Sequence, residues 1–397
     1  MTHEPRLPTL PTRPLRPLVA LALAALAALA VGCATVADGP IDRGSLSRLL
    51  RERGIRDAQV VIPYEPTDEM RAWLRRAIPN AQVPTEKRLQ LLLGALLDPK
   101  GLGITYEAHF TGTAAEVFAH RRANCLAFTN IFVGLARELG VEAFYLDVDD
   151  IQRFEKEGDL VVVSGHVSVG FAVDRAIQVL DFTMAPAAHY REIKRISDRT
   201  AVALYYSNRG GELLRAGEYR TALPWLRSSV VLDPDLARGW VNLGVALRRT
   251  GDPAGAEVAY RKALEVDPDS SSAYQNLSSL LHLRGQEREA EELLALAARV
   301  GVRNPFSYLN LGDVSLAHGR LDEARRFYKK ALRLYREHSE PYAAMGQWAV
   351  AAGDLKEARR WLDKAVSIDR ANDRVQQLAA ALQRADRAEP GSGGGVG

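Results

Sequence analysis

Apolar residues recur at three- and four-residue steps between Cys125 and Gly140, and this spacing predicts a helix. The apolar positions are Leu126, Ile131, Leu135 and Leu139. Gly140 follows the last of them, which is typical of a helix C-terminus. Cys125 is therefore expected in the first turn, where unpaired backbone amides and the positive end of the helix dipole favour a thiolate.

Two runs rich in β-branched and aromatic residues follow this helix. They span residues 160–173 and 176–182 and are separated by the turn-like pair Asp174-Arg175. His166 lies in the first run and Asp181 in the second, so antiparallel pairing would bring the imidazole near the carboxylate. Strand alternation puts His166 on the face opposite Val167. His166 can therefore face the helix of Cys125 only if its own side of the sheet lines a cleft.

Shorter apolar patterns precede Cys125. They predict a short helix around residues 46–50, a possible strand at residues 59–63, a helix around residues 70–78 and a helix at residues 86–97. Residues 110–122 then lead into Cys125. We expect these elements to complete the first lobe of the domain that holds the cysteine.

The second half of the chain repeats with a period of 34 residues. One alanine position shows the period, at Ala222, Ala256, Ala290, Ala324 and Ala358. An asparagine position keeps the same register, at Asn208, Asn242, Asn276 and Asn310. Residues 202–369 closely resemble tetratricopeptide repeats, which implies an all-α solenoid of five helix pairs. Residues 373–387 predict a capping helix, and residues 390–397 a flexible tail.

Two sets of repeat residues are candidates for contact with a partner. They are Arg215, Arg238, Arg248 and Arg249 in the early repeats, and Phe306 and Leu309 in the fourth. A groove that is basic at one end and apolar at the other suits a peptide or protein ligand. We interpret the asparagine row as helix-packing hydrogen bonds rather than as a ladder that binds a ligand.

The start of the chain has the pattern of a secretory signal. Arg6, Arg13 and Arg16 precede an apolar run at residues 18–31, which is shorter than the roughly 20 residues of a transmembrane helix. Ala30-Val31-Gly32-Cys33 resembles the lipobox of bacterial lipoproteins, which implies cleavage before Cys33 and lipid attachment to it. Because Ala34 is not Asp, the outer membrane, facing the periplasm, is the expected location. An ordinary secretory peptide is the alternative.

A thiol, an imidazole and a carboxylate can form a nucleophile, a base and an orienting group. Residues 84–183 resemble the transglutaminase-like superfamily through the residues Cys125, Phe128, Leu135, Ala136, Arg137, Gly140, His166 and Leu180-Asp181-Phe182-Thr183. The resemblance implies an α+β, papain-like domain with Cys125, His166 and Asp181 as catalytic residues. Ala123 and Val167 depart from the family, which usually has a glycine before the cysteine and an aromatic residue after the histidine. A similar residue order occurs in papain-like peptidases that process bacteriocins.

The composition of the chain bears on which partners and cofactors are expected. The 397 residues are 47% hydrophobic and carry a net charge of +3, which gives no reason to expect a nucleic-acid partner. Two cysteines cannot supply a zinc cluster, and Gly101-Leu102-Gly103 lacks the rest of a phosphate-binding loop. No metal or cofactor is expected. With Cys33 used for lipid, Cys125 would have no disulfide partner.

These patterns divide the chain into a sequence of expected regions. They are a signal peptide at 1–32, a linker at 33–44, the transglutaminase-like domain at 45–200, five tetratricopeptide repeats at 201–370, a capping helix at 371–388 and a tail at 389–397. In one hypothesis Cys125 attacks an amide carbonyl, His166 carries the proton and Asp181 orients the imidazole, giving either hydrolysis or acyl transfer. In the other, the domain is an inactive scaffold and the repeats recruit a partner.

Overall fold

The computed structural model describes residues 41–55, 60–79, 82–157, 160–173, 176–180, 182, 193–301 and 304–388. Four of the sequence-based expectations lie outside the described residues. They are the signal segment 1–32, the lipidation site Cys33, the carboxylate of Asp181 and the tail at 389–397. None of the helices within the described ranges is long and apolar enough to cross a membrane.

Four helices precede the helix of Cys125 within residues 41–55, 60–79 and 82–124. They are α2 (Arg43–Glu52), α3 (Asp68–Ala77), α4 (Thr85–Leu97) and α5 (Ala114–His120). Side chains cap three of them, because Asp42, Thr67 and Thr113 each accept a hydrogen bond from a backbone N–H in the first turn. The prediction of a possible strand at residues 59–63 was wrong for residues 60–63, which the structure describes and which form no strand. There the Val61 backbone pairs with the Tyr206 hydroxyl instead of a neighbouring strand.

Helix α6 (Cys125–Glu138) is the centre of the first core and begins at Cys125, as the periodicity predicted. The Asn124 side chain caps it by accepting the Ala127 N–H at 2.9 Å. Gly140 follows the helix with a φ of 71°, the left-handed conformation typical of a helix end. Gly134 lies so close to Tyr64 that an added Cβ would overlap the Tyr64 carbonyl oxygen.

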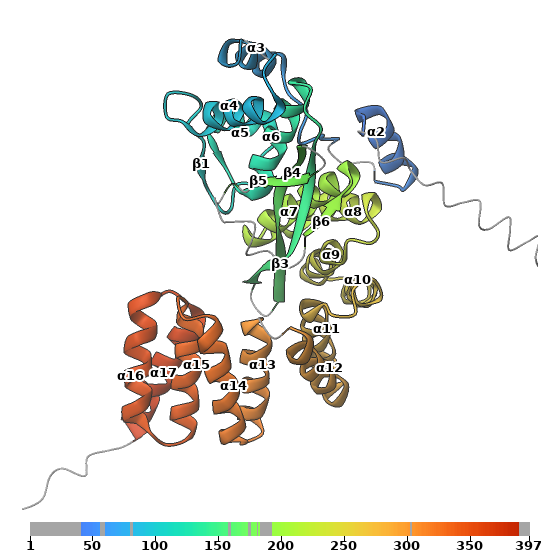
Figure 1. Ribbon diagram of the computed structural model, residues 1–397. Helices are drawn as coiled ribbons and strands as arrows, with labels where there is room; N and C mark the ends of the chain where they lie inside the picture. Colours follow the sequence, from blue (N-terminus) through green and yellow to red (C-terminus); the bar gives the residue numbers. More distant parts are fainter. Residues whose placement is uncertain are drawn as a thin grey trace, which may run out of the picture. The chain divides into compact units, whose positions relative to one another are not determined.

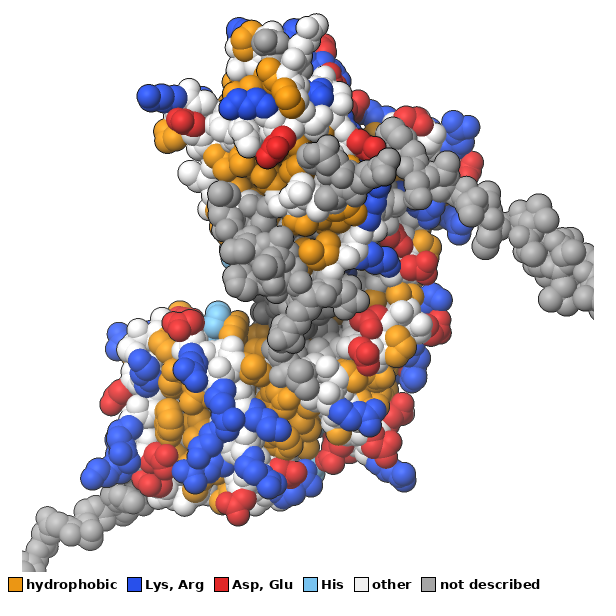
Figure 2. Space-filling view, viewed as in Figure 1, with side chains coloured by type: hydrophobic (Ala, Val, Ile, Leu, Met, Phe, Trp, Pro, Cys, Tyr) orange, Lys and Arg blue, Asp and Glu red, His pale blue; other side chains and the backbone are white. Residues whose placement is uncertain are grey.

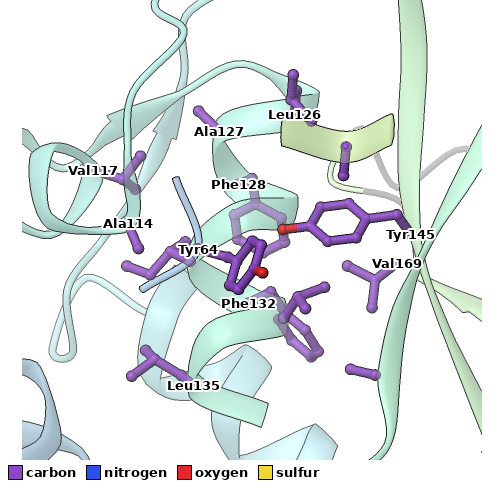
Figure 3. Close-up of a cluster of buried hydrophobic side chains, with 14 of the residues drawn as sticks. Tyr64, Ala114, Val117, Leu126, Ala127, Phe128, Phe132, Leu135, Tyr145 and Val169 are labelled. Carbon is purple, nitrogen blue, oxygen red and sulfur yellow. The ribbon is translucent and has the colours of Figure 1, made fainter. Parts of the chain in front are cut away.

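A four-stranded antiparallel sheet packs against α6. Its strands, in spatial order, are β5 (Ala176–Leu180), β4 (Leu160–Val173), β3 (Ala143–Glu157) and β6 (Ile193–Ile196). A small parallel pair, β1 (Thr105–Tyr106) and β2 (Arg122–Ala123), lies apart from it. Phe128 and Phe132 of α6 are buried in one cluster with Tyr145 of β3 and Val169 of β4, as Figure 3 shows. The N-terminal region is therefore a mixed α and β structure built around α6.

The second half consists of antiparallel helix pairs (Figure 1). The pairs are α7 (Asp198–Arg215) with α8 (Tyr219–Leu232), α9 (Ala237–Arg249) with α10 (Pro253–Val266), α11 (Ser271–Leu283) with α12 (Glu287–Val300), α13 (Pro305–Ala317) with α14 (Leu321–Leu334), and α15 (Ser339–Ala351) with α16 (Leu355–Ile368). A glycine with positive φ joins the helices of every pair, at Gly217, Gly251, Gly285, Gly319 and Gly353. In two of these pairs a glycine of the first helix lies against a tyrosine ring of the second, with Gly244 on Tyr260 and Gly312 on Tyr328.

Helix α17 (Asp373–Ala388) covers the end of the last repeat. Val375, Leu378 and Leu382 are buried in the same cluster as α15, as expected for a helix that closes a solenoid. Figure 2 shows Lys and Arg side chains over the last repeats. Two basic side chains of this region lie over aromatic rings: the Arg325 guanidinium is 4.6 Å from the centroid of Trp348, and the Lys330 ammonium is 5.2 Å from the centroid of Tyr308. Part of this charge therefore packs against the solenoid surface.

Strand β4 lies against the first helices of the early repeats. Asn276 of α11 accepts the Val161 N–H at 2.8 Å and donates to the Val161 carbonyl at 2.9 Å. Asn242 of α9 makes the same two bonds with Val163, each at 3.2 Å. The interpretation of the asparagine row as helix-packing bonds was therefore wrong for these two residues, because both bind an extended backbone. The strand they bind belongs to the same chain and carries His166.

Candidate functional site

Cys125 and His166 line the same pocket, which has a volume of about 30 Å³. Its walls come from the start of α6, from β4 and from α7, and they include the polar side chains of His109, Asn208 and Arg215. A volume of this size holds about one water molecule. The predicted nucleophile and base therefore line one small pocket, whose walls contain both polar and apolar side chains.

The cysteine is fixed through the first turn of its helix. Cys125 is half-buried and is in no disulfide among the described residues. Its carbonyl oxygen accepts a hydrogen bond from the Thr129 hydroxyl at 2.8 Å. The same hydroxyl lies 3.3 Å from the Val167 carbonyl oxygen on β4. Thr129 thus ties the turn that carries Cys125 to the residue that follows His166.

The histidine lies deeper than the cysteine. His166 is 6% exposed, and its Nε2 lies 3.4 Å from the Ser168 hydroxyl. On the opposite side of the strand, Val167 and Val169 are buried in the core around α6. The alternation predicted from the sequence therefore holds, and the side of β4 that carries His166 lines the pocket.

The third predicted catalytic residue, Asp181, is outside the described residues, although both of its neighbours are within them. Leu180 pairs with Val169 in the β4–β5 ladder. Phe182 stacks on Phe128 of α6, with ring centroids 4.2 Å apart. The chain on either side of Asp181 is thus held by β4 and by the helix of Cys125.

The solenoid contributes one wall of the pocket, which the sequence did not predict. The Thr111 N–H donates to the Glu212 carboxylate of α7 at 2.6 Å, and the Thr111 hydroxyl accepts from the Asn124 amide at 2.8 Å. Arg209 pairs with the other oxygen of Glu212 at 2.7 Å. Burial raises the pKa of Glu212 above its ordinary value despite these bonds. A hydrogen-bonded path therefore joins the cap of α6 to the first repeat.

The two residues departing from the transglutaminase-like pattern are both buried. Ala123 pairs with Tyr106 in the β1–β2 ladder and is fully buried. Val167 belongs to the core around α6. Both positions thus take part in packing next to the pocket, and neither side chain lines it.

The predicted partner-binding arginines have other contacts. Arg238 forms an ion pair with Asp147 of β3 and lies against Gly165, so it joins the solenoid to the sheet. Arg248 donates to the Ser279 hydroxyl at 3.1 Å, and Arg249 lies over the Tyr219 ring at 5.9 Å. Arg215 lines the pocket of Cys125. The basic end of the expected groove is therefore partly used within the chain.

The apolar end of the expected groove requires a correction. Phe306 is 1% exposed and Leu309 is 0% exposed. Both are buried in one cluster that also contains Val161 of β4 and Tyr328 of α14. These side chains form part of the core of the fourth repeat, together with Val161 of β4. They do not form an exposed docking surface.

Within the described ranges, no group of three or more His, Cys, Asp and Glu side chains could hold a metal ion. Sequence reasoning missed Asn124, Thr111 and Glu212, whose roles depend on contacts between distant segments. The sequence analysis named Asn208 as a member of the asparagine row but did not predict that it lines the pocket. Its place in that row was the one sequence signal that pointed to it.

Comparison with known proteins identifies the helical half. Four models of the tetratricopeptide repeat family match residues 237–270, 259–292, 284–339 and 315–382. The C-terminal region is thus an all-α solenoid of tetratricopeptide repeats. Repeats of this kind typically bind peptide or protein partners through extended surfaces. No curated protein matches the chain.

Solved structures resemble the repeats at low identity. The structure of pilF from Pseudomonas aeruginosa is 24% identical, covers 49% of this chain and 95% of its own, and has a TM-score of 0.40. A tetratricopeptide-repeat protein of Thermus thermophilus is 23% identical over 46% of this chain and 99% of its own, with a TM-score of 0.40. YrrB, described as a tetratricopeptide-repeat protein with an unusual peptide-binding site, is 20% identical, covers 45% of this chain and 92% of its own, and has a TM-score of 0.33.

Proposed function

We propose that this protein is a cysteine-dependent enzyme that cleaves an amide or transfers its acyl group, with Cys125 as the nucleophile. The observation that carries the proposal is the shared pocket of Cys125 and His166, with Cys125 at the start of a well-capped helix. The dipole and unpaired amides at a helix start favour a thiolate. The resemblance to the transglutaminase-like superfamily supports the same assignment.

In the proposed reaction the Cys125 sulfur attacks the carbonyl carbon while His166 accepts the thiol proton. The backbone N–H groups at the start of α6 would stabilise the oxyanion. His166 then protonates the leaving amine, and a thioester remains on Cys125. Water or a second amine attacks the thioester, so hydrolysis and transfer share every step up to that point. Asp181 would hold the imidazole in the required tautomer.

Acetylation by p-nitrophenyl acetate tests this proposal, since the reagent is a small acyl donor. We expect a burst of p-nitrophenolate and an acetyl group on Cys125, found by peptide mass spectrometry. Cys125→Ala should abolish the burst, and His166→Ala should slow it strongly. Acetylation that is spread over lysines, or that is equal in the His166 variant, would contradict the proposal.

A second candidate is a scaffold without catalysis, in which the repeats bind a protein partner. The family matches to the repeats favour it, as does the pocket volume of about 30 Å³. The acetylation experiment separates the two candidates, because a scaffold predicts no burst. In both cases we propose a lipid anchor at Cys33 and an outer-membrane location facing the periplasm, on the basis of the lipobox resemblance.

A further inference from the structure

A series of hydrogen bonds runs from the first repeat of the solenoid to the first turn of α6. The Glu212 carboxylate of α7 accepts the Thr111 N–H at 2.6 Å, and the Thr111 hydroxyl accepts from the Asn124 amide at 2.8 Å. The Asn124 side-chain oxygen accepts the Ala127 N–H at 2.9 Å. Asn124 immediately precedes Cys125, so the series ends in the turn that carries the proposed nucleophile.

The bonds of this series fix the orientation of the Asn124 amide. The Ala127 N–H can only donate, so it requires the oxygen of that amide and directs the amide nitrogen to the Thr111 hydroxyl. Thr111 is 2% exposed and Asn124 is 7% exposed, which makes water a poor substitute for a lost partner. The cap of α6 therefore depends on Thr111, and the backbone of Thr111 is held in turn by Glu212.

Glu212 itself does not line the pocket of Cys125 and His166. Its side chain is 15% exposed, and its second carboxylate oxygen pairs with Arg209 at 2.7 Å. Both oxygens are thus held by groups of this chain, which makes the carboxylate a fixed acceptor for the Thr111 N–H. The structure connects Glu212 to the pocket through Thr111 and not through direct contact with the proposed nucleophile.

We propose that Glu212 is a positioning residue for Cys125 and acts through Thr111 and Asn124. The inference rests on the proposed function and adds that the first repeat takes part in it. The cap holds the backbone N–H groups at the start of α6 in place, and these groups stabilise a thiolate and the oxyanion of the proposed reaction. Without an acceptor at residue 212 the first turn is less firmly held, and the thiolate is stabilised less.

The pH dependence of Cys125 alkylation by iodoacetamide tests this role, because only the thiolate reacts. Glu212→Ala removes the acceptor and should lower the ratio of thiolate to thiol about fivefold at a given pH, the factor that corresponds to one net hydrogen bond. The profile then moves to higher pH, while the plateau rate at high pH stays close to that of the unmodified protein. Glu212→Gln keeps an oxygen that can accept the Thr111 N–H, so it should retain the original profile.

Further variants separate positioning from a general loosening of the structure. Thr111→Val removes the hydroxyl at nearly constant volume and should shift the profile as Glu212→Ala does, whereas Thr111→Ser keeps the hydroxyl and should not. Asp198→Ala is the matched control, because the ion pair of Arg137 and Asp198 at 2.7 Å joins the other end of α6 to α7. It should lower the unfolding temperature and leave the alkylation profile in place.

The inference is wrong if the profiles of Glu212→Ala and Thr111→Val coincide with that of the unmodified protein, or if Asp198→Ala shifts the profile equally. The Thr111 variants keep the test valid even if Glu212→Ala unfolds. If Cys125 in the unmodified protein titrates like an ordinary thiol, the proposed function fails and the inference fails with it. That result concerns the unmodified protein and the others concern the variants, so the two failures are distinguishable.

Discussion

The side-chain amide of Asn276 accepts the Val161 N–H at 2.8 Å and donates to the Val161 carbonyl at 2.9 Å. This pair joins the third repeat to the strand that carries His166. The equivalent pair joins Asn242 to Val163. Through these bonds the solenoid holds β4, which forms one wall of the pocket. A repeat domain that usually receives other proteins here holds a strand of its own chain.

The first prediction concerns the hydrogen bonds between Asn276 and Val161. Asn276→Ala leaves the Val161 N–H and carbonyl buried without their partner, which costs about 1–3 kcal/mol. Urea unfolding should show the loss as a lower midpoint with an unchanged slope. Asn310→Ala serves as a comparison, since it removes the same side chain elsewhere in the row. Equal stability of the Asn276 variant and the unmodified protein would show that the pair does not hold β4 in solution.

The second prediction concerns the packing of α6. Gly134→Ala forces a methyl group onto the Tyr64 carbonyl oxygen, and overpacking of this kind costs about 1–3 kcal/mol. Gly94→Ala is the matched control, because no atom lies within 4 Å of an added Cβ in α4. The control should gain about 0.5–1 kcal/mol from helix propensity. Thermal unfolding of both variants should therefore shift in opposite directions, and a shared direction would contradict the packing described here.

The third prediction concerns Glu212 and pH. Since burial raises the pKa of Glu212 in the folded protein, the folded state keeps this proton to a higher pH than the unfolded chain does. Ionisation of Glu212 therefore costs stability as the pH rises above 4.5, its ordinary value. Glu212→Gln should be more stable than the parent at pH 7, and the gain should disappear at pH values below 4.5. A gain that grows on acidification would contradict the sign of the shift.

The fourth prediction concerns the proposed anchor. Cys33→Ser removes the only side chain in the lipobox that can carry the lipid, so the protein should be released from membranes and lack the mass of the lipid. Fractionation of cells that express each form, followed by intact mass measurement, provides the readout. Recovery of the serine variant in the membrane fraction with the parent's mass would refute lipid attachment at this residue.

Local patterns predicted the helices well, because periodicity and end signals are recorded in neighbouring residues. The helix from Cys125 to Gly140 and the 34-residue period of the solenoid are the clearest cases. The order of the residues and the family resemblance also predicted that Cys125 and His166 would act together. It could not predict that Asn242 would bind β4 or that Thr111 would join Asn124 to Glu212. Those contacts depend on how distant segments pack, which no local spacing records.

The pairing of Cys125 with His166 is the central claim, and the pH dependence of alkylation tests it most directly. Iodoacetamide modification of Cys125 should stay fast well below pH 8.5, about the pKa of an ordinary thiol, and should slow there in His166→Ala. His120→Ala, which removes an exposed histidine of α5 outside the pocket, should have no effect. If Cys125 titrates as an ordinary thiol and His166→Ala leaves the profile unchanged, the two residues do not act together and the enzymatic account is wrong.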